Sequence, residues 1–295
     1  MRIGSRVAAF EEWQSAVQVV FLACPKDEVS PRRFPGKFAP ARHFPILTGF
    51  DSFVTAQTPP LPIHTLQRRR NPRMPRLLIL VPTAMERRGL DPMLASVSGQ
   101  NYRVELCGFG PVAAAARTAQ LLAEHAPQRV LLIGIAGRLD DRLAIGAAYQ
   151  FERVACYGIG AGTGGNFVPA AALGWHQWMG AADGTSPQIG DQIDGLMSCA
   201  ASGGAGVRAD LLVTVCAAAA CAEDARLRKQ IYPAAAAEDM EGFAVAFACR
   251  MRGVPLDIVR GISNTAGDRD RSGWQVAAAL EAAGRLSLQI MAEVS

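Results

Sequence analysis

Three short segments of the sequence place polar side chains directly after apolar runs. The first is Pro82–Glu86, which follows the apolar run Leu77–Val81. The second is Asp239–Gly242, and the third starts at Arg260–Asn264 and continues to Trp274. Carboxylates accept protons and hydrogen bonds, and a carboxamide both donates and accepts hydrogen bonds. Ligands of α/β proteins bind at the carboxyl ends of strands, so these segments hold the candidate binding and catalytic groups.

Each segment also has a purely structural interpretation. A carboxylate at the start of a helix, as expected for Glu241, is commonly a cap or a partner of the helix dipole. An Asn after a strand, such as Asn264, is commonly a turn residue. The charged run 268–271 is commonly a surface cluster of ion pairs. The occurrence of all three segments in one chain, in this order, favours a functional site.

The elements that must position these residues alternate along the chain. Short apolar runs predict buried strands, and longer stretches of helix-forming residues predict helices. The predicted strands are 77–81, 103–108, 129–135, 147–156, 211–216 and 256–262, and the predicted helices are 113–125, 239–252 and 273–294. This alternation predicts an α/β domain with a mainly parallel or mixed central sheet.

The first 73 residues differ from the rest and are expected to be a poorly ordered extension rich in Pro and Arg. Residues 1–76 carry 12 Lys and Arg against 5 Asp and Glu, a balance of +7, whereas the remaining residues carry 18 against 21, a balance of −3. The net charge of +4 therefore arises in the front segment, and a nucleic-acid-binding core is not supported. One hypothesis is that the natural protein begins at Met74 and that the preceding residues are a gene-start artefact.

Composition limits the class of protein further. Half of the 295 residues are hydrophobic, which is enough for a core of normal size. No uncharged apolar run reaches the roughly 18 residues of a membrane span. The seven cysteines show no CxxC pair or Cys/His metal spacing and are interpreted as buried thiols of a cytoplasmic protein. The four histidines are dispersed, so neither a metal nor another cofactor is expected.

A glycine-rich segment, 160–165, matches the G-x-G-x-x-G pattern of dinucleotide sites. That pattern must open a helix whose N-terminus receives the pyrophosphate. Here Pro169 follows shortly and disfavours helix at Val168. The segment is therefore predicted to be a flexible loop, which makes a Rossmann oxidoreductase a weaker hypothesis. Such a loop could close over a ligand with Phe167 as an apolar face.

The order and spacing of the polar segments resemble the nucleoside phosphorylase and nucleosidase superfamily, and most closely its futalosine hydrolases. The resemblance covers residues 74–295 and implies one nucleosidase domain with a three-layer α/β/α sandwich around a central mixed sheet. It also implies a purine nucleoside as ligand and a homo-oligomeric state. The motifs that carry it are 134–137 (GIAG), 237–244 (AEDMEGFA), 260–264 (RGISN), 267–271 (GDRDR) and Trp274.

The resemblance implies a role in sugar binding for three of these residues. Hydrolysis of an N-glycosidic bond passes through a cationic, oxocarbenium-like sugar. Glu241 is expected to accept hydrogen bonds from the 2′- and 3′-hydroxyls and to stabilise that cation. Met240 is expected to form an apolar wall against the sugar. Gly137 belongs to a segment that resembles the family's glycine turn beside the ribosyl site.

The water-activating group is expected in the segment after the first strand. The methylthioadenosine nucleosidases have an acid three residues after an Ala-Met pair, but this chain has Arg88 there. Glu86 is the nearest carboxylate and is therefore predicted to be the general base. Thr83 is expected to orient the substrate or the water.

Asn264 falls where adenine-specific nucleosidases of the superfamily place an Asp that protonates purine N7. A carboxamide cannot transfer a proton, but its NH₂ group can hydrogen-bond N7 or O6. That favours hypoxanthine over adenine as the leaving base, because the O6 of a 6-oxopurine shares the developing charge. An Asn can also pair with the N6 and N7 edge of adenine, so adenine stays an alternative. Asp270 and Trp274 are further candidates for the base pocket.

The sequence predicts hydrolysis of futalosine to hypoxanthine and dehypoxanthine futalosine, a step of menaquinone biosynthesis, but rival functions stay open. A purine nucleoside phosphorylase would need several Arg residues and a hydroxyl at the glycine turn, where this chain has Ile135. Arg138 and Arg117 form no obvious phosphate cluster with it. A methylthioadenosine/S-adenosylhomocysteine nucleosidase and a non-catalytic nucleoside-binding protein are also compatible with the same motifs.

Overall fold

Strands and helices alternate through the part of the chain that the computed structural model describes, residues 76–95, 102–196 and 208–292. The predicted extension 1–73 lies outside the described residues. The strands are β1 (Leu77–Val81), β2 (Tyr102–Leu106), β3 (Arg129–Arg138), β4 (Ala148–Cys156), β5 (Gly160–Ala161), β6 (Val168–Pro169), β7 (Gln192–Ile193), β8 (Arg208–Thr214), β9 (Ala235–Asp239) and β10 (Leu256–Thr265). The α-helices are α2 (Ala84–Leu94), α3 (Pro111–His125), α4 (Ala222–Ile231), α5 (Gly242–Arg252) and α6 (Val276–Ala292). No helix of the described ranges has the length and hydropathy that a membrane crossing requires.

The central sheet is mixed, and part of it closes on itself. Its order is β10-β4-β8-β9-β3-β1-β2, with a further pairing between β10 and β3. The pairs β1–β2, β1–β3, β3–β10, β4–β8 and β8–β9 are parallel, whereas β4–β10 and β3–β9 are antiparallel. Strand β3 therefore lies between β1, β10 and β9, and the carboxyl ends of these neighbours meet around it.

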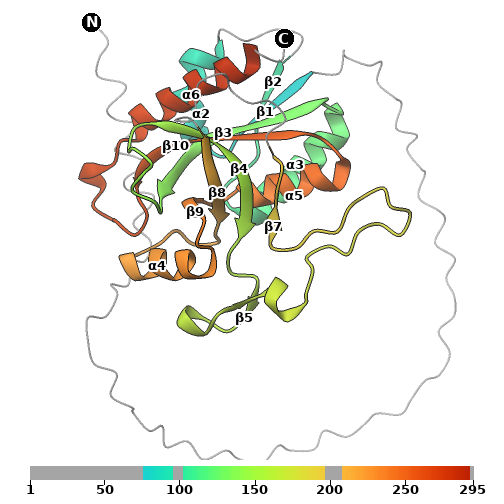
Figure 1. The fold of residues 1–295 in the computed structure, drawn as a ribbon. Coiled ribbons are helices and arrows are strands. Elements are labelled where there is room, and N and C mark those ends of the chain that lie inside the picture. Colours follow the sequence, from blue (N-terminus) through green and yellow to red (C-terminus); the bar gives the residue numbers. More distant parts are fainter. Residues whose placement is uncertain (1–75, 96–101, 197–207, 293–295) are drawn as a thin grey trace, which may run out of the picture. The chain divides into compact units, whose positions relative to one another are not determined.

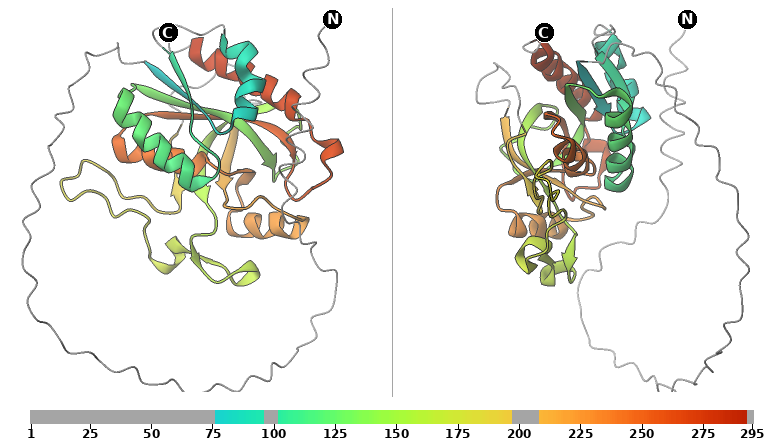
Figure 2. Two further views of the ribbon diagram at one scale, coloured as in Figure 1. Left: turned by 180° about the vertical axis from the view of Figure 1, so that it is seen from behind. Right: turned by 90° about the vertical axis from the view of Figure 1, so that its right-hand side faces the viewer.

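Helices cover both faces of the sheet, as β1 illustrates. Successive residues of a strand point to opposite faces. Leu78 and Leu80 pack in the core that contains side chains of α3 and α5, whereas Ile79 packs with side chains of α2 and α6. Figures 1 and 2 show the two helix pairs on opposite sides of the sheet. The predicted three-layer α/β/α sandwich with a mixed sheet is confirmed.

Three local predictions were wrong. Residues 235–239 form the buried strand β9, although the sequence places Asp239 in a helix. Strand β10 continues to Thr265, past its predicted end at residue 262, so Asn264 lies within the strand and not after it. Residues 134–137 belong to β3 and not to a glycine turn, because they pair with β10, and Gly137 pairs with β9 as well. In each case pairing with a distant strand decides the local structure.

The glycine-rich segment 160–165 has no α-helix after it. It contains β5 and a short 3₁₀ helix, Gly164–Asn166, and β5 pairs with β6. The helix N-terminus that a pyrophosphate site requires is therefore missing from this segment.

Candidate active site

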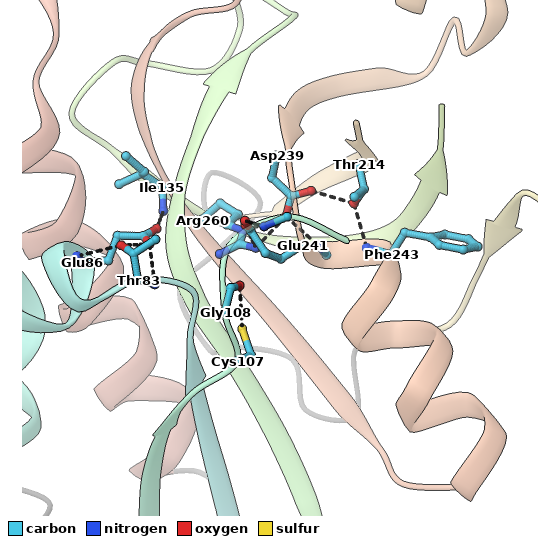
Figure 3. Close-up of polar contacts among 12 residues, drawn as sticks. Thr83, Glu86, Cys107, Gly108, Ile135, Thr214, Asp239, Glu241, Phe243 and Arg260 are labelled. Atoms are coloured by element: carbon cyan, nitrogen blue, oxygen red, sulfur yellow. Dashed lines mark hydrogen bonds and ion pairs between the residues drawn. The ribbon is translucent and has the colours of Figure 1, made fainter. Parts of the chain in front are cut away.

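Arg260 lies at the centre of the candidate site. Its side chain projects from β10, is fully buried, and lies between Asp239 and Glu241 (Figure 3). The guanidinium donates two hydrogen bonds to Asp239 Oδ2, from Nε at 3.0 Å and from Nη2 at 2.6 Å. Nη2 also lies 3.6 Å from Glu241 Oε2. A buried charge must be compensated by charged or polar partners, and these two acids supply that compensation.

Glu241 is held by an element distant in sequence. It is the residue before α5, but its side chain makes no cap hydrogen bond to that helix. Instead its Oε1 accepts a hydrogen bond from the backbone N of Gly110 at 3.0 Å. Gly110 precedes α3 with a φ of 81°, a left-handed conformation that glycine adopts without strain. The cap interpretation of Glu241 is therefore wrong, and its carboxylate is oriented from the start of α3.

Glu86 and Thr83 form a capping box at the start of α2. Thr83 donates to Glu86 Oε2 from its backbone N at 3.1 Å and from its hydroxyl at 2.7 Å. Glu86 Oε1 accepts from the backbone N of Ile135 on β3 at 3.0 Å. The Glu86 carboxylate is thus held by hydrogen bonds from the start of α2 and from β3. The Thr83 hydroxyl is engaged in orienting Glu86.

Gly134 brings Glu86 and Arg260 together. A methyl group on its Cα would overlap Arg260 Nη1 and would lie 2.6 Å from Glu86 Oε1. Both atoms therefore reach the same small space beside the backbone of β3. Within the described part of the chain, Arg260 Nη1 is buried and has no hydrogen-bond partner. It is a buried donor that no acceptor of these residues satisfies, and it lies close to Glu86 Oε1.

Asn264 lies on the same strand as Arg260, near its carboxyl end. Its Oδ1 accepts from the Ser263 hydroxyl at 2.7 Å, and its Nδ2 donates to the carbonyl of Thr265 at 2.8 Å. One N–H of the carboxamide stays available for a ligand. Asn264 is in register with Gly137 of β3, which is in register with Glu238 of β9. These residues therefore lie at one level of the sheet.

Comparison with known proteins identifies the family. The model of the phosphorylase superfamily matches residues 73–294. The chain belongs to the phosphorylase superfamily. This confirms the family that the sequence motifs predict.

Similar proteins of this superfamily include nucleosidases. The chain is 31% identical over 180 residues to a futalosine hydrolase of Streptomyces coelicolor, covering 59% of this chain and 72% of that protein. It is 30% identical over 191 residues to a 5′-methylthioadenosine/S-adenosylhomocysteine nucleosidase of Shewanella baltica, covering 60% and 72%. The fold matches the solved structure of futalosine hydrolase from Helicobacter pylori with a TM-score of 0.58 and 18% identity, over 75% of this chain and 98% of that one. The predicted enzyme class, an N-glycosyl hydrolase, is confirmed by these relatives.

Three predicted site residues make contacts with residues outside the Arg260 cluster. Asp270 is exposed and accepts hydrogen bonds from the backbone and hydroxyl of Ser272. Trp274 is half-buried, with the guanidiniums of Arg269 and Arg271 above its ring at 5.2 and 5.9 Å. Phe167 is buried against Tyr157, with ring centroids 4.9 Å apart. The assignment of Asp270 and Trp274 to the base pocket, and of Phe167 to a loop that covers the ligand, stays a prediction.

Met240 lies between two residues of the cluster, Asp239 and Glu241, and is half-buried. It packs against the small apolar core that includes Val213 and Tyr232. Its predicted contact with the sugar also stays a prediction. In the described residues, no group of three His, Cys, Asp or Glu side chains is placed to hold a metal ion.

Sequence reasoning missed the roles of Arg260 and Asp239. Asp239 Oδ1 accepts from the Thr214 hydroxyl at 2.6 Å, and Oδ2 accepts from the backbone N of Gly242 at 2.8 Å. The same hydroxyl accepts from the backbone N of Phe243 at 2.7 Å. Asp239 is therefore a fixed support for the guanidinium. An Arg inside a strand expected to be buried was the signal that could have pointed to a buried acidic partner.

The cluster holds more negative than positive charge, and this changes its protonation. Burial raises the pKa of Glu86 above its ordinary value, while Arg260 and the hydrogen bonds from Thr83 and Ile135 oppose that rise. Burial also raises the pKa of Glu241 to about 7, with Arg260 opposing and Asp239 adding to the rise. Three buried carboxylates around one guanidinium cannot all stay ionised without cost. Both glutamates are therefore better proton acceptors than exposed ones.

The raised pKa of Glu241 predicts an acidic limb in the pH profile. Only the ionised carboxylate stabilises a cationic sugar, so activity is lost as pH falls through the pKa, which is about 7. We expect kcat/KM to fall about tenfold per pH unit below that value and to level off above about pH 8. Base release measured across this range in buffers of constant ionic strength checks the limb. A profile that stays flat down to about pH 5.5 contradicts it.

Proposed function

We propose that this protein hydrolyses the N-glycosidic bond of a 6-oxopurine nucleoside, and specifically converts futalosine to hypoxanthine and dehypoxanthine futalosine. The observation that carries the proposal is the convergence of Arg260 Nη1 and Glu86 Oε1 beside Gly134, in the same buried cluster as Glu241. Such a cluster supplies a carboxylate for the sugar, and a donor beside a second carboxylate for a water molecule. The nucleosidases among the relatives support the same reaction class.

Glu241 binds the ribose in this proposal. Its Oε1 already accepts from Gly110, and its remaining lone pairs accept hydrogen bonds from the 2′- and 3′-hydroxyls. As the bond between C1′ and the purine lengthens, the ring becomes positively charged. A fixed carboxylate in a buried site then stabilises the transition state more than the ground state.

Glu86 and Arg260 act on the water. Arg260 Nη1 donates a hydrogen bond to the water oxygen, and Glu86 Oε1 accepts one of its protons. The water oxygen forms a bond to C1′ while the C1′–N9 bond breaks and its electron pair leaves with the purine. The proton passes to Glu86, whose pKa burial has raised. The purine anion takes up one proton from solvent to leave as hypoxanthine, and Glu86 returns its proton to solvent. Holding the nucleophile at a fixed place lowers the entropic part of the barrier.

Asn264 stabilises the departing base. Ser263 and Thr265 fix the carboxamide, so its second N–H can donate to purine N7. A neutral donor suits hypoxanthine, whose O6 shares the developing charge, better than adenine. This supports a 6-oxopurine nucleoside over the adenine nucleosides named for the Shewanella relative.

Replacing Asn264 by Asp tests that assignment. The carbonyl of Thr265 lies 2.8 Å from the present Nδ2, so it favours the protonated acid, which can protonate purine N7. For Asn264→Asp we expect the ratio of kcat/KM for methylthioadenosine to that for futalosine to rise at least about tenfold. Asn264→Ala is the control, because it removes the donor without supplying a proton, so kcat/KM is expected to fall for both substrates without a tenfold rise for methylthioadenosine over futalosine. An unaltered ratio in Asn264→Asp contradicts the role of this residue in base choice.

Water is favoured over phosphate as the nucleophile. Arg138 donates to the Thr265 hydroxyl at 3.0 Å and to the carbonyl of Leu143 at 3.0 Å. Arg117 lies at the surface beside Glu105 and Glu124. Both guanidiniums are thus engaged away from the Arg260 cluster, so they do not assemble a set of phosphate donors there.

The experiment that tests the proposal is a base-release assay on a panel of nucleosides. Futalosine, inosine, methylthioadenosine and adenosine are each incubated with the full chain, with and without phosphate, and free base is quantified. Phosphate-independent release of hypoxanthine from futalosine is expected. A requirement for phosphate would reassign the protein as a phosphorylase, and faster release of adenine would reassign its substrate.

A further inference from the structure

A buried ion pair outside the catalytic cluster holds the β8–α4 loop, residues 215–221. Arg228 of α4 and Glu238 of β9 are 6% and 5% exposed, and Arg228 Nη1 donates to Glu238 Oε2. Arg228 Nη2 also donates to the carbonyl of Ala217 at 2.8 Å. Glu238 Oε1 accepts from the backbone N of Ala219 at 2.9 Å. Each member of the ion pair therefore fixes one peptide group of the loop.

The two ends of the β8–α4 loop contact Asp239 and Gly267. At its start, the backbone N of Val215 donates to the carbonyl of Asp239 at 2.9 Å, beside the support of Arg260. At its end, the carbonyl of Cys221 contacts the backbone of Gly267 so closely that a Cβ there would overlap it. Gly267 is three residues after Asn264. The loop therefore extends from the sugar-binding side of the cluster to the turn that follows the base-binding carboxamide.

The guanidinium of Arg228 also contacts an aromatic side chain outside the β8–α4 loop. Arg228 Cζ lies 5.8 Å from the centroid of the Tyr157 ring, within the range of a cation–π contact. Tyr157 follows β4 directly, and its ring packs against the ring of Phe167, the residue before β6. One buried side chain thus contacts both the β8–α4 loop and the aromatic pair of Tyr157 and Phe167.

The residue types of the loop show why it must be positioned by other residues. Ala217 and Ala218 are exposed, and their methyl groups can make only apolar contacts. Such contacts suit the face of a planar base, but methyl groups cannot hold the loop in place by side-chain hydrogen bonds. A buried ion pair contributes little net stability compared with apolar residues of similar size, so stability alone does not account for it.

We propose that Arg228 and Glu238 are positioning residues for base recognition. They fix the β8–α4 loop and the Tyr157–Phe167 pair as walls of the pocket that receives the purine. The inference rests on the proposed function, because it takes a purine nucleoside as the ligand. Since the pair does not touch the groups that act on C1′ or on the water, its loss affects binding far more than the chemical step.

The test uses Arg228→Met and the double variant Arg228→Met/Glu238→Met in the full chain. For both we expect the KM for futalosine to rise about tenfold while kcat stays within about threefold, and the Kd for hypoxanthine in calorimetry to rise by a similar factor. Arg226→Met is the matched control. Arg226 lies on the same helix in an exposed ion pair with Glu223, so its KM and Kd are expected to equal those of the wild type.

The double variant keeps the test decisive if the single variant folds poorly, because it leaves no unpaired charge in the interior. Unchanged KM and Kd in the double variant overturn the inference. So does a fall in kcat that matches a fall in folded protein, with KM unchanged, since that is the mark of a merely structural role. If the wild type binds hypoxanthine but hydrolyses no nucleoside, the proposed function fails. The inference is then decided by hypoxanthine binding alone: a Kd that is higher in the double variant than in the wild type supports it, and an equal Kd overturns it.

Discussion

Replacing Glu241 by Gln is expected to lower kcat/KM for base release by about a thousandfold, or about 4 kcal/mol of transition-state stabilisation. The substitution keeps the size of the side chain and an oxygen that can accept from Gly110. It removes the negative charge that faces the cationic sugar, and charge-assisted hydrogen bonds are worth about 1.5–3 kcal/mol each. The loss is therefore expected mainly in kcat, because the charge on the sugar develops only in the transition state.

Folding of Glu241→Gln is expected to stay intact, which separates this result from a loss of structure. The folded-state pKa of Glu241 is raised to about 7, so its ionised form destabilises the folded protein at alkaline pH. Removing the carboxylate is therefore expected to leave the melting temperature at about pH 8 equal to or higher than that of the wild type. Glu223→Gln, an exposed acid on α4, serves as the control for activity. A loss of less than tenfold for Glu241→Gln would remove Glu241 from the catalytic assignment.

The parts of the fold that follow from local pattern could be predicted from the sequence. Strand β1 is a run of apolar residues, and both its bounds and its burial on two faces agree with that pattern. The spacing of Thr83 and Glu86 has the form of a capping box, which is also a local signal. Strand β9 could not be predicted in this way. Its sequence, AAAED, is rich in a strong helix former, and only pairing with β3 and β8 makes it a strand.

The catalytic cluster depends on contacts that no local pattern contains. Gly110 and Glu241 are 131 residues apart, and Asp239 and Arg260 are 21 apart. The sequence singled out the segments of Glu86, Glu241 and Asn264 because each places polar side chains directly after an apolar run. It could not assign a role to Arg260, because the acid that compensates its charge was placed on a helix. Knowing which strands are neighbours is what turns three polar segments into one site.

The second large effect is expected for Gly134→Ala. A methyl group at this position would overlap Arg260 Nη1 and crowd Glu86 Oε1, so both groups must move apart. Displacing a catalytic group by about 1 Å lowers rates by about a hundredfold, and here two groups move, so we expect kcat to fall by at least that factor. Binding of hypoxanthine is expected to change little, because the base contacts Asn264 and not this end of the cluster.

Gly190→Ala is the matched control for Gly134→Ala. Among the described residues its added methyl would meet no atom closer than 4.0 Å, so activity and melting temperature are expected to equal those of the wild type. For Gly134→Ala itself, hypoxanthine calorimetry reports whether the folded pocket persists while steady-state kinetics report the chemical step. Wild-type kcat in this variant would show that Glu86 and Arg260 do not act together on the nucleophile. Low kcat with intact base binding, in contrast, locates the water-activating step in the space beside β3, because no other predicted contact with the substrate lies there.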